Sequence, residues 1–195
     1  MAKIIDTLRH EHKAIAEILD VLEREIGTLT HEQKNRRADY GLAWSIIDYF
    51  LNFPDLVHHP KEECILRKMQ EVNPRGAEPV GDLSAGHVQL SNELEALAAA
   101  LKQAMDDGAA PRPELIDRAR AFIQHQRQHL AGEERLFFPL AEDLLSPADW
   151  AQVDHTFTAR LDPLVGGESA ERFEAQYRHI LDLEAAHLVP GGPLR

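Results

Sequence analysis

A histidine and a glutamate stand four residues apart in the run HQRQHLAGEERLFFPL, as His129 and Glu133. Residues four apart lie on one face of an α-helix, one turn from each other. Apolar residues continue this face at alternating spacings of three and four, as on the buried face of a bundled helix. They are Leu115, Ala119 and Phe122 before the pair, and Leu136 and Leu140 after it. Because a buried carboxylate without a partner costs several kcal/mol, Glu133 needs a partner in the interior, and a metal ion is one such partner.

Three further predicted helices carry histidines on their apolar faces. Residues 2–29 carry His12, residues 38–72 carry His58 and Glu62, and residues 83–105 carry His87, while His129 and Glu133 belong to residues 113–145. The apolar face of residues 38–72 comprises Trp44, Ile47, Leu51, Ile65, Met69 and Val72. Pro54 and Pro60 lack the backbone donor that a helix interior needs, so a kink or break is predicted near them.

Long helices joined by short connections are typical of an up-down-up-down four-helix bundle, so the predicted fold class is all-α. Residues 1–145 are expected to form this bundle as one domain. Ser146 and Pro147 suit the N-cap and the first position of a further helix. Residues 146–195 are therefore expected to add two helices that pack on the bundle as a C-terminal extension.

The up-down-up-down order predicts one shared level for the polar residues of the four apolar faces. They are His12, His58, Glu62, His87, His129 and Glu133. Four imidazoles and two carboxylates make a nitrogen and oxygen site, in which each carboxylate can bridge two ions and leave two histidines for each. Iron or manganese suits this ligand set, although affinity order alone would favour copper or zinc.

The second predicted helix offers two histidine–glutamate pairs, His58 with Glu62 and His59 with Glu63. The pair His58 and Glu62 continues the apolar face that includes Ile65, and is therefore assigned to the site. His59 is expected to donate a hydrogen bond to a residue that binds the metal. His125, one turn before His129, is expected at the rim of the site or in contact with one of its ligands.

Two segments resemble signatures of a known family. HHPKEECIL (58–66) and HLAGEERLFFP (129–139) are similar to the second-helix and fourth-helix motifs of the hemerythrin-like family, also called HHE cation-binding domains. The resemblance covers residues 1–145 and implies a non-haem di-iron centre. Its metal ligands would be His12, His58, Glu62, His87, His129 and Glu133. The implied cofactor is two iron ions in an oxo- or hydroxo-bridged pair, ahead of manganese or zinc.

Two departures from the oxygen-carrying hemerythrins bear on function. The carriers look to have a fifth histidine on the third helix, one turn after the first histidine of that helix. This chain has Ser91 at that position. They also have an aspartate five residues after the last histidine, where this chain has Glu133 at four. The resemblance therefore implies binding and redox handling of oxygen, peroxide, nitric oxide or iron itself, with an electron donor that the sequence does not identify. A di-iron oxidoreductase with peroxidase-like or oxidase activity, and a metal-free helical interaction module, remain as alternatives.

The composition of the chain limits the kinds of binding partner and the cellular location that we expect. The formal net charge of −12 argues against nucleic acid or an anionic membrane surface as partner. No apolar run approaches the roughly 20 residues of a membrane span, and the N-terminus becomes polar too early for a secretory signal. A single cysteine, Cys64, excludes an internal disulfide and a multi-cysteine zinc site. A cytoplasmic location is expected.

Overall fold

The computed structural model describes residues 3–30, 40–107, 113–160 and 166–188, and every regular element within these ranges is helical. The elements are α1 (Lys3–Thr30), α2 (Gly41–Phe53), η1 (Pro54–His58), α3 (His59–Val72), α4 (Pro74–Ala77), η2 (Glu78–Val80), α5 (Leu83–Asp107), α6 (Pro113–Gly132), η3 (Glu133–Phe137), α7 (Phe138–Leu144), α8 (Pro147–Arg160) and α9 (Gly166–Leu188). The all-α prediction is confirmed. None of these helices has both the length and the hydropathy of a membrane span.

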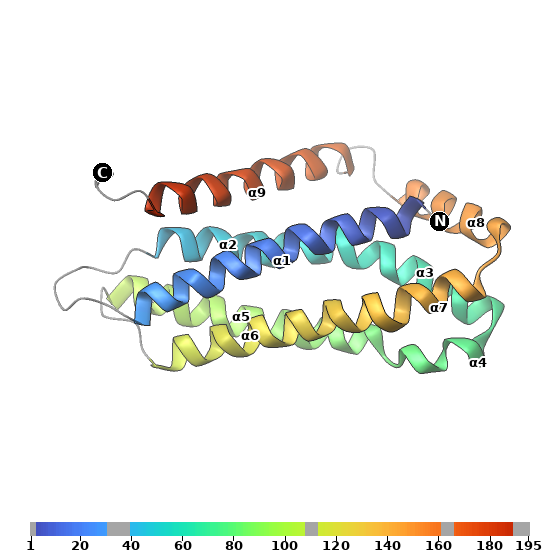
Figure 1. The fold of residues 1–195 in the computed structure, drawn as a ribbon, viewed down its shortest axis with the longest axis horizontal. Helices are drawn as coiled ribbons and strands as arrows, with labels where there is room; N and C mark the ends of the chain where they lie inside the picture. The colour runs from blue at the N-terminus through green and yellow to red at the C-terminus, as the bar shows by residue number, and fades with distance from the viewer. Residues whose placement is uncertain (1–2, 31–39, 108–112, 161–165, 189–195) are drawn as a thin grey trace.

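Four long helical segments run lengthwise beside one another (Figure 1): α1, the continuous α2–η1–α3, α5, and the continuous α6–η3–α7. Helix α1 packs on α2 and α6, and α5 packs on the same two helices. Helix α9 lies along α1 and α2, and α8 packs on α3. The start of α8 has the predicted cap, because the Ser146 hydroxyl accepts from the Asp149 amide and the Asp149 carboxylate accepts from Ser146.

The apolar core consists of two separate clusters with a polar layer between them. Along α1, Leu8 belongs to one cluster and Ile15 to the other, and His12 lies between them. The same order holds on the segment α6–η3–α7, where Glu133 separates Leu130 from Phe137. The buried polar residues of the described chain are His12, His58, Lys61, Glu62, His87, Gln126 and Glu133. His12, His58, Glu62, His87 and Glu133 thus lie at one level between the two apolar clusters, whereas Gln126 lies about two turns before Glu133 on α6.

Two π-helical turns, η1 and η3, shift the buried face relative to the prediction. Leu136 was expected in the core but is 44% exposed, and Leu140 is only half-buried. A π-turn holds one residue more than an α-turn, so the positions that follow Glu133 into the core are Phe137, Phe138 and Ala141. Spacings of three and four residues, when continued across η3, therefore predict each buried position one residue too early in the sequence.

The same correction applies around Pro54. The predicted break is a π-turn within a continuous helix, η1, which accommodates a residue without a backbone donor. Counting back across this turn, the buried positions are Phe53 and Phe50, whereas the predicted Leu51 and Trp44 are half-buried. Val72, also expected in the core, is 45% exposed because α3 ends there.

Candidate metal centre

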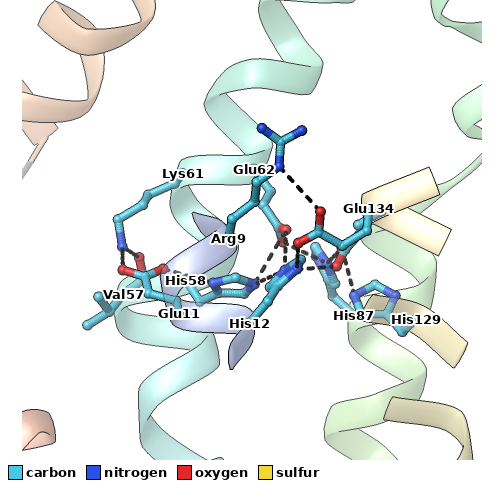
Figure 2. A network of polar contacts seen from close by, with 11 residues as sticks. Arg9, Glu11, His12, Val57, His58, Lys61, Glu62, His87, His129 and Glu134 are labelled. Carbon is cyan, nitrogen blue, oxygen red and sulfur yellow. Dashed lines mark hydrogen bonds and ion pairs between the residues drawn. The ribbon is translucent and has the colours of Figure 1, made fainter. Parts of the chain in front are cut away.

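The polar layer receives side chains from all four long segments (Figure 2). Helix α1 supplies His12, and α5 supplies His87. The π-turn η1 ends at His58, one turn before Glu62 on α3. His129 lies in the last turn of α6, and Glu133 is the first residue of η3. All six residues singled out from the sequence are thus brought together. The side chains of Glu62 and Glu133 are 0% and 2% exposed.

Several atoms of this layer are buried without a hydrogen-bond partner in the described residues. They are both carboxylate oxygens of Glu62, both of Glu133, and Nε2 of His87 and of His129. Nearly all buried polar groups in proteins are satisfied, so a cluster of orphaned acceptors requires an explanation. Cations bound between these atoms would satisfy them, and imidazole nitrogens with carboxylate oxygens form a donor set that divalent transition metals accept. The residues present therefore fit a metal site.

One group of ligand atoms is formed by His12, His58, Glu62 and Glu133, all within 4.8 Å of one another. Nε2 of His12 lies 3.2 Å from Nε2 of His58 and 3.4 Å from Oε2 of Glu133. Nε2 of His58 lies 3.4 Å from Oε1 of Glu62. Two ligand atoms bound about 2.1 Å from one ion, at angles of about 90–110°, lie about 3.0–3.4 Å apart. The spacing of this group matches one metal ion.

A second group lies on the other side of the same carboxylates. Nε2 of His87 lies 3.3 Å from Oε2 of Glu62, and Nε2 of His129 lies 2.9 Å from Oε1 of Glu133. Oε1 of Glu133 is also 3.6 Å from Nε2 of His87. Each glutamate therefore turns one oxygen toward each pair of histidines. Two cations, one beside each pair of histidines, could each be held by one oxygen of Glu62 and one of Glu133.

By distance alone, His59 could belong to the second group, because a nitrogen of its ring lies within 4.8 Å of ligand atoms of Glu62, His87 and His129. Its ring, however, stacks on the ring of His87 at a centroid distance of 3.7 Å and an interplanar angle of 10°. A nitrogen lone pair lies in the plane of its imidazole, and one ion cannot lie in two parallel stacked planes. In this conformation His59 supports the ring of His87, and the two imidazoles could not both bind one ion.

Two carboxylates that the sequence did not single out hold the outer nitrogens of the first group. Nδ1 of His58 donates to Glu11 at 2.9 Å, and Nδ1 of His12 donates to Glu134 at 3.0 Å. With Nδ1 as donor, the lone pair of Nε2 is left to face the ion, which is a common arrangement around metal-binding histidines. The sequence signal for both residues was their place directly beside a predicted ligand, Glu11 before His12 and Glu134 after Glu133.

In the metal-free protein these groups shift one another's pKa. Burial disfavours the charged imidazoles, but the carboxylates of Glu133 and Glu62 outweigh burial and raise the pKa of His12 and of His87 to about 9. Against burial, the charge of Glu62 also raises the pKa of His58 to about 9. Burial opposes ionisation of both glutamates, but the histidines hold the pKa of Glu62 well below its usual value and lower that of Glu133 to about 2. A metal must displace these protons, so its binding should release protons.

Two other residues considered from the sequence, His125 and Glu63, lie outside the layer. His125, expected near the site, is exposed and pairs with Glu93 at 2.8 Å. Glu63, the alternative to Glu62, is 41% exposed and accepts from Ser84. Ser91 is half-buried on α5, one turn after His87.

A family model described as Hemerythrin HHE cation binding domain matches residues 3–141, more than two thirds of the chain. The matched range contains all six residues of the two groups and ends before α8. No curated protein and no solved structure gives a significant match.

Proposed function

Because the chain belongs to the family of hemerythrin HHE cation binding domains, we propose that it is a non-haem di-iron protein. It binds two iron ions and uses them to bind and redox-handle a small ligand, namely oxygen, peroxide or nitric oxide, with electrons from a separate donor. Residues 1–145 form the metal-binding up-down-up-down bundle, and residues 146–195 form a helical extension on it.

One observation carries this proposal: the oxygens of Glu62 and Glu133 are divided between two pairs of histidines. The distances that support it are 3.3–3.4 Å from Glu62 to His58 and His87, and 2.9–3.4 Å from Glu133 to His129 and His12. A single ion would need only one such pair of histidines, and without metal the two buried carboxylates have only protonated histidines to balance their charge. We therefore assign His12, His58, Glu62, His87, His129 and Glu133 as the ligands.

The two groups differ in their access to solvent. The side chains of His12 and His58 are 5% and 1% exposed, whereas those of His87 and His129 are 11% and 13% exposed. A small ligand would therefore enter on the side of His87 and His129. When bound, the metal supplies a redox-active Lewis acid. Ser91, on the same helix as His87, offers a short neutral hydroxyl where a carrier has an imidazole, which leaves room for an incoming ligand.

Metal analysis of purified protein tests the proposal. Metal-free protein reconstituted with ferrous iron under nitrogen should hold about two ions per chain, and the oxidised product should absorb in the near ultraviolet. Glu62→Gln and Glu133→Gln each remove a bridging charge, so each should hold one ion or fewer. Glu63→Gln, which changes an exposed neighbour outside the layer, is the control and should retain two ions.

One ion or none in the wild-type protein after reconstitution would refute the two-ion site. An absence of any metal would instead favour the interaction module. Consumption of peroxide or nitric oxide over many turnovers by the reduced, iron-loaded protein would identify an oxidoreductase, while binding without turnover would identify a carrier or store.

A further inference from the structure

Lys61 places a charged amine in the protein interior, with its side chain only 7% exposed. Its Nζ contacts two acceptors: Oε1 of Glu11 at 2.5 Å and the backbone oxygen of Val57 at 2.8 Å. Removing a lysine from water costs several kcal/mol unless its charge is paired and hydrogen-bonded. Lys61 satisfies this condition through a residue of another helix, so it ties α3 to α1 (Figure 2).

The same contacts lead to the metal layer. Glu11 uses its second oxygen, Oε2, to accept the Nδ1 hydrogen of His58 at 2.9 Å. Val57, whose oxygen Lys61 binds, belongs to the π-turn η1 that ends at His58. Lys61 therefore fixes both the carboxylate that orients the His58 ring and the backbone turn that carries this ring.

Helix α8 covers this arrangement from outside. The ring of Phe157 lies 5.5 Å from Nζ of Lys61, within the range of a cation–π contact. Lys68 on the same face of α3 bonds Gln152 of α8 at 2.6 Å. The C-terminal extension is thus in contact with a residue one position before a bridging carboxylate.

His12 has a looser counterpart. Its Nδ1 partner, Glu134, is 37% exposed and faces Arg9, whose guanidinium is shared with Glu142 at distances of 3.4–3.5 Å. Glu11, by comparison, is 13% exposed and its lysine partner 7%. The contacts that hold His58 through Glu11 and Lys61 are therefore more buried, and their distances are shorter, than those that hold His12.

We propose that Lys61 and Glu11 are positioning residues for His58. Together they hold its ring so that Nε2 faces the ion of the first group, and Phe157 of α8 covers the amine of Lys61. This proposal rests on the proposed function, because the orientation of the His58 ring matters only if the ring binds a metal.

Titration of the metal-free protein with Co²⁺, followed by visible absorption, tests the proposal without iron chemistry. Loss of a residue that hydrogen-bonds a metal ligand typically costs about 10–100-fold in metal affinity. Lys61→Met, which keeps the apolar stem, and Glu11→Gln should each lower the affinity for one of the two Co²⁺ ions by this factor. Each should also change the visible absorption bands of the bound cobalt. Since both act through one path, the double variant should be little weaker than either single one. Lys61→Arg keeps the charge and should restore most of the affinity and the wild-type bands.

Arg67→Met is the matched control. Arg67 lies on the same helix and pairs with Glu63 at 3.7 Å, but both side chains are more than 40% exposed and neither belongs to the layer. This variant should bind two Co²⁺ ions as the wild type does.

Far-ultraviolet circular dichroism of each metal-free variant establishes that it is folded. Folded Lys61→Met and Glu11→Gln proteins that bind both ions with wild-type affinity and bands would overturn the positioning role while leaving the proposed function intact. If Lys61→Met does not fold, Glu11→Gln decides alone by the same criterion. Wild-type protein that holds no pair of metal ions would overturn the proposed function and the positioning role together.

Discussion

His58 and His59 are adjacent imidazoles, yet the structure gives them different surroundings. His58 is 1% exposed, bonds Glu11 through Nδ1 and turns Nε2 toward Glu62. His59 stacks face to face on His87. The structure thus buries His58 with Nε2 toward Glu62, on the face that the apolar spacing predicted, and gives His59 a ring contact with His87.

Alanine substitutions at these two histidines test the assignment. His58→Ala removes a ligand and should abolish binding of at least one ion. His59→Ala removes only the ring that supports His87 and should lower affinity by about 10–100-fold. Isothermal titration of metal-free protein with ferrous iron under nitrogen measures both. A larger loss for His59→Ala would mean that the lone pair of His59, and not that of His58, points at an ion.

At the scale of elements, the two π-turns lie where ligands are carried. The turn η1 ends at His58 and the turn η3 begins at Glu133. Such turns add one residue and rotate everything after them by about one position, which is why they often accompany functional sites. Here they allow a ligand and the flanking apolar residues to face the interior together, although a regular helix with this sequence would bury Leu136 in place of Phe137.

The position of η3 predicts unequal effects for two neighbouring truncations. Leu136→Ala changes a side chain that is 44% exposed and should alter the free energy of unfolding by less than about 0.5 kcal/mol. Phe137→Ala empties a position that is 2% exposed and should cost about 3–5 kcal/mol. Urea denaturation of the metal-free proteins measures both values. Equal costs, or a larger cost at Leu136, would show that the helix continues without the extra residue.

At the scale of the whole molecule, a layer of ionisable groups divides the apolar core into two clusters. Without metal, this layer is held by pairing between imidazolium and carboxylate groups. The stability of the metal-free protein must then depend on pH in a direction that the pKa shifts determine.

The metal-free protein should be most stable in mildly acidic solution. The folded pKa of His12, His58 and His87 is about 9, above the roughly 6.5 of an unfolded histidine, so their contribution is complete below about pH 6.5 and disappears as the pH rises through about 9. The lowered pKa of Glu133 acts oppositely, and its contribution is lost as the pH falls through about 2.

Thermal unfolding in the presence of a chelator, from pH 6 to pH 10, measures this dependence. The melting temperature should fall as the pH rises. Glu133→Gln is the comparison, because removing a carboxylate that raises the pKa of His12 and His87 should flatten the fall. A wild-type melting temperature that rises over this range would contradict charged pairing in the layer.

Much of the site could be predicted from the sequence because its signals are local. A four-residue spacing puts a histidine and a glutamate on one helix face regardless of what surrounds the helix. The apolar positions around His12 and His87 follow ordinary helical periodicity, and all of the helices on which the six residues were placed are present. Residue type and spacing thus determined the all-α fold, the polar level and the donor set.

Only the tertiary structure decided how these groups meet. Three- and four-residue spacings do not count the extra residue of each π-turn, so Leu51 and Leu136 were placed wrongly. Val72 was placed wrongly because α3 ends there. The stack of His59 on His87 and the bonds from Glu11 and Glu134 join residues 28 to 122 positions apart. Such pairings are set by side-chain rotamers at helix interfaces, because periodicity fixes which face a residue occupies but not the neighbour that its side chain reaches across that face.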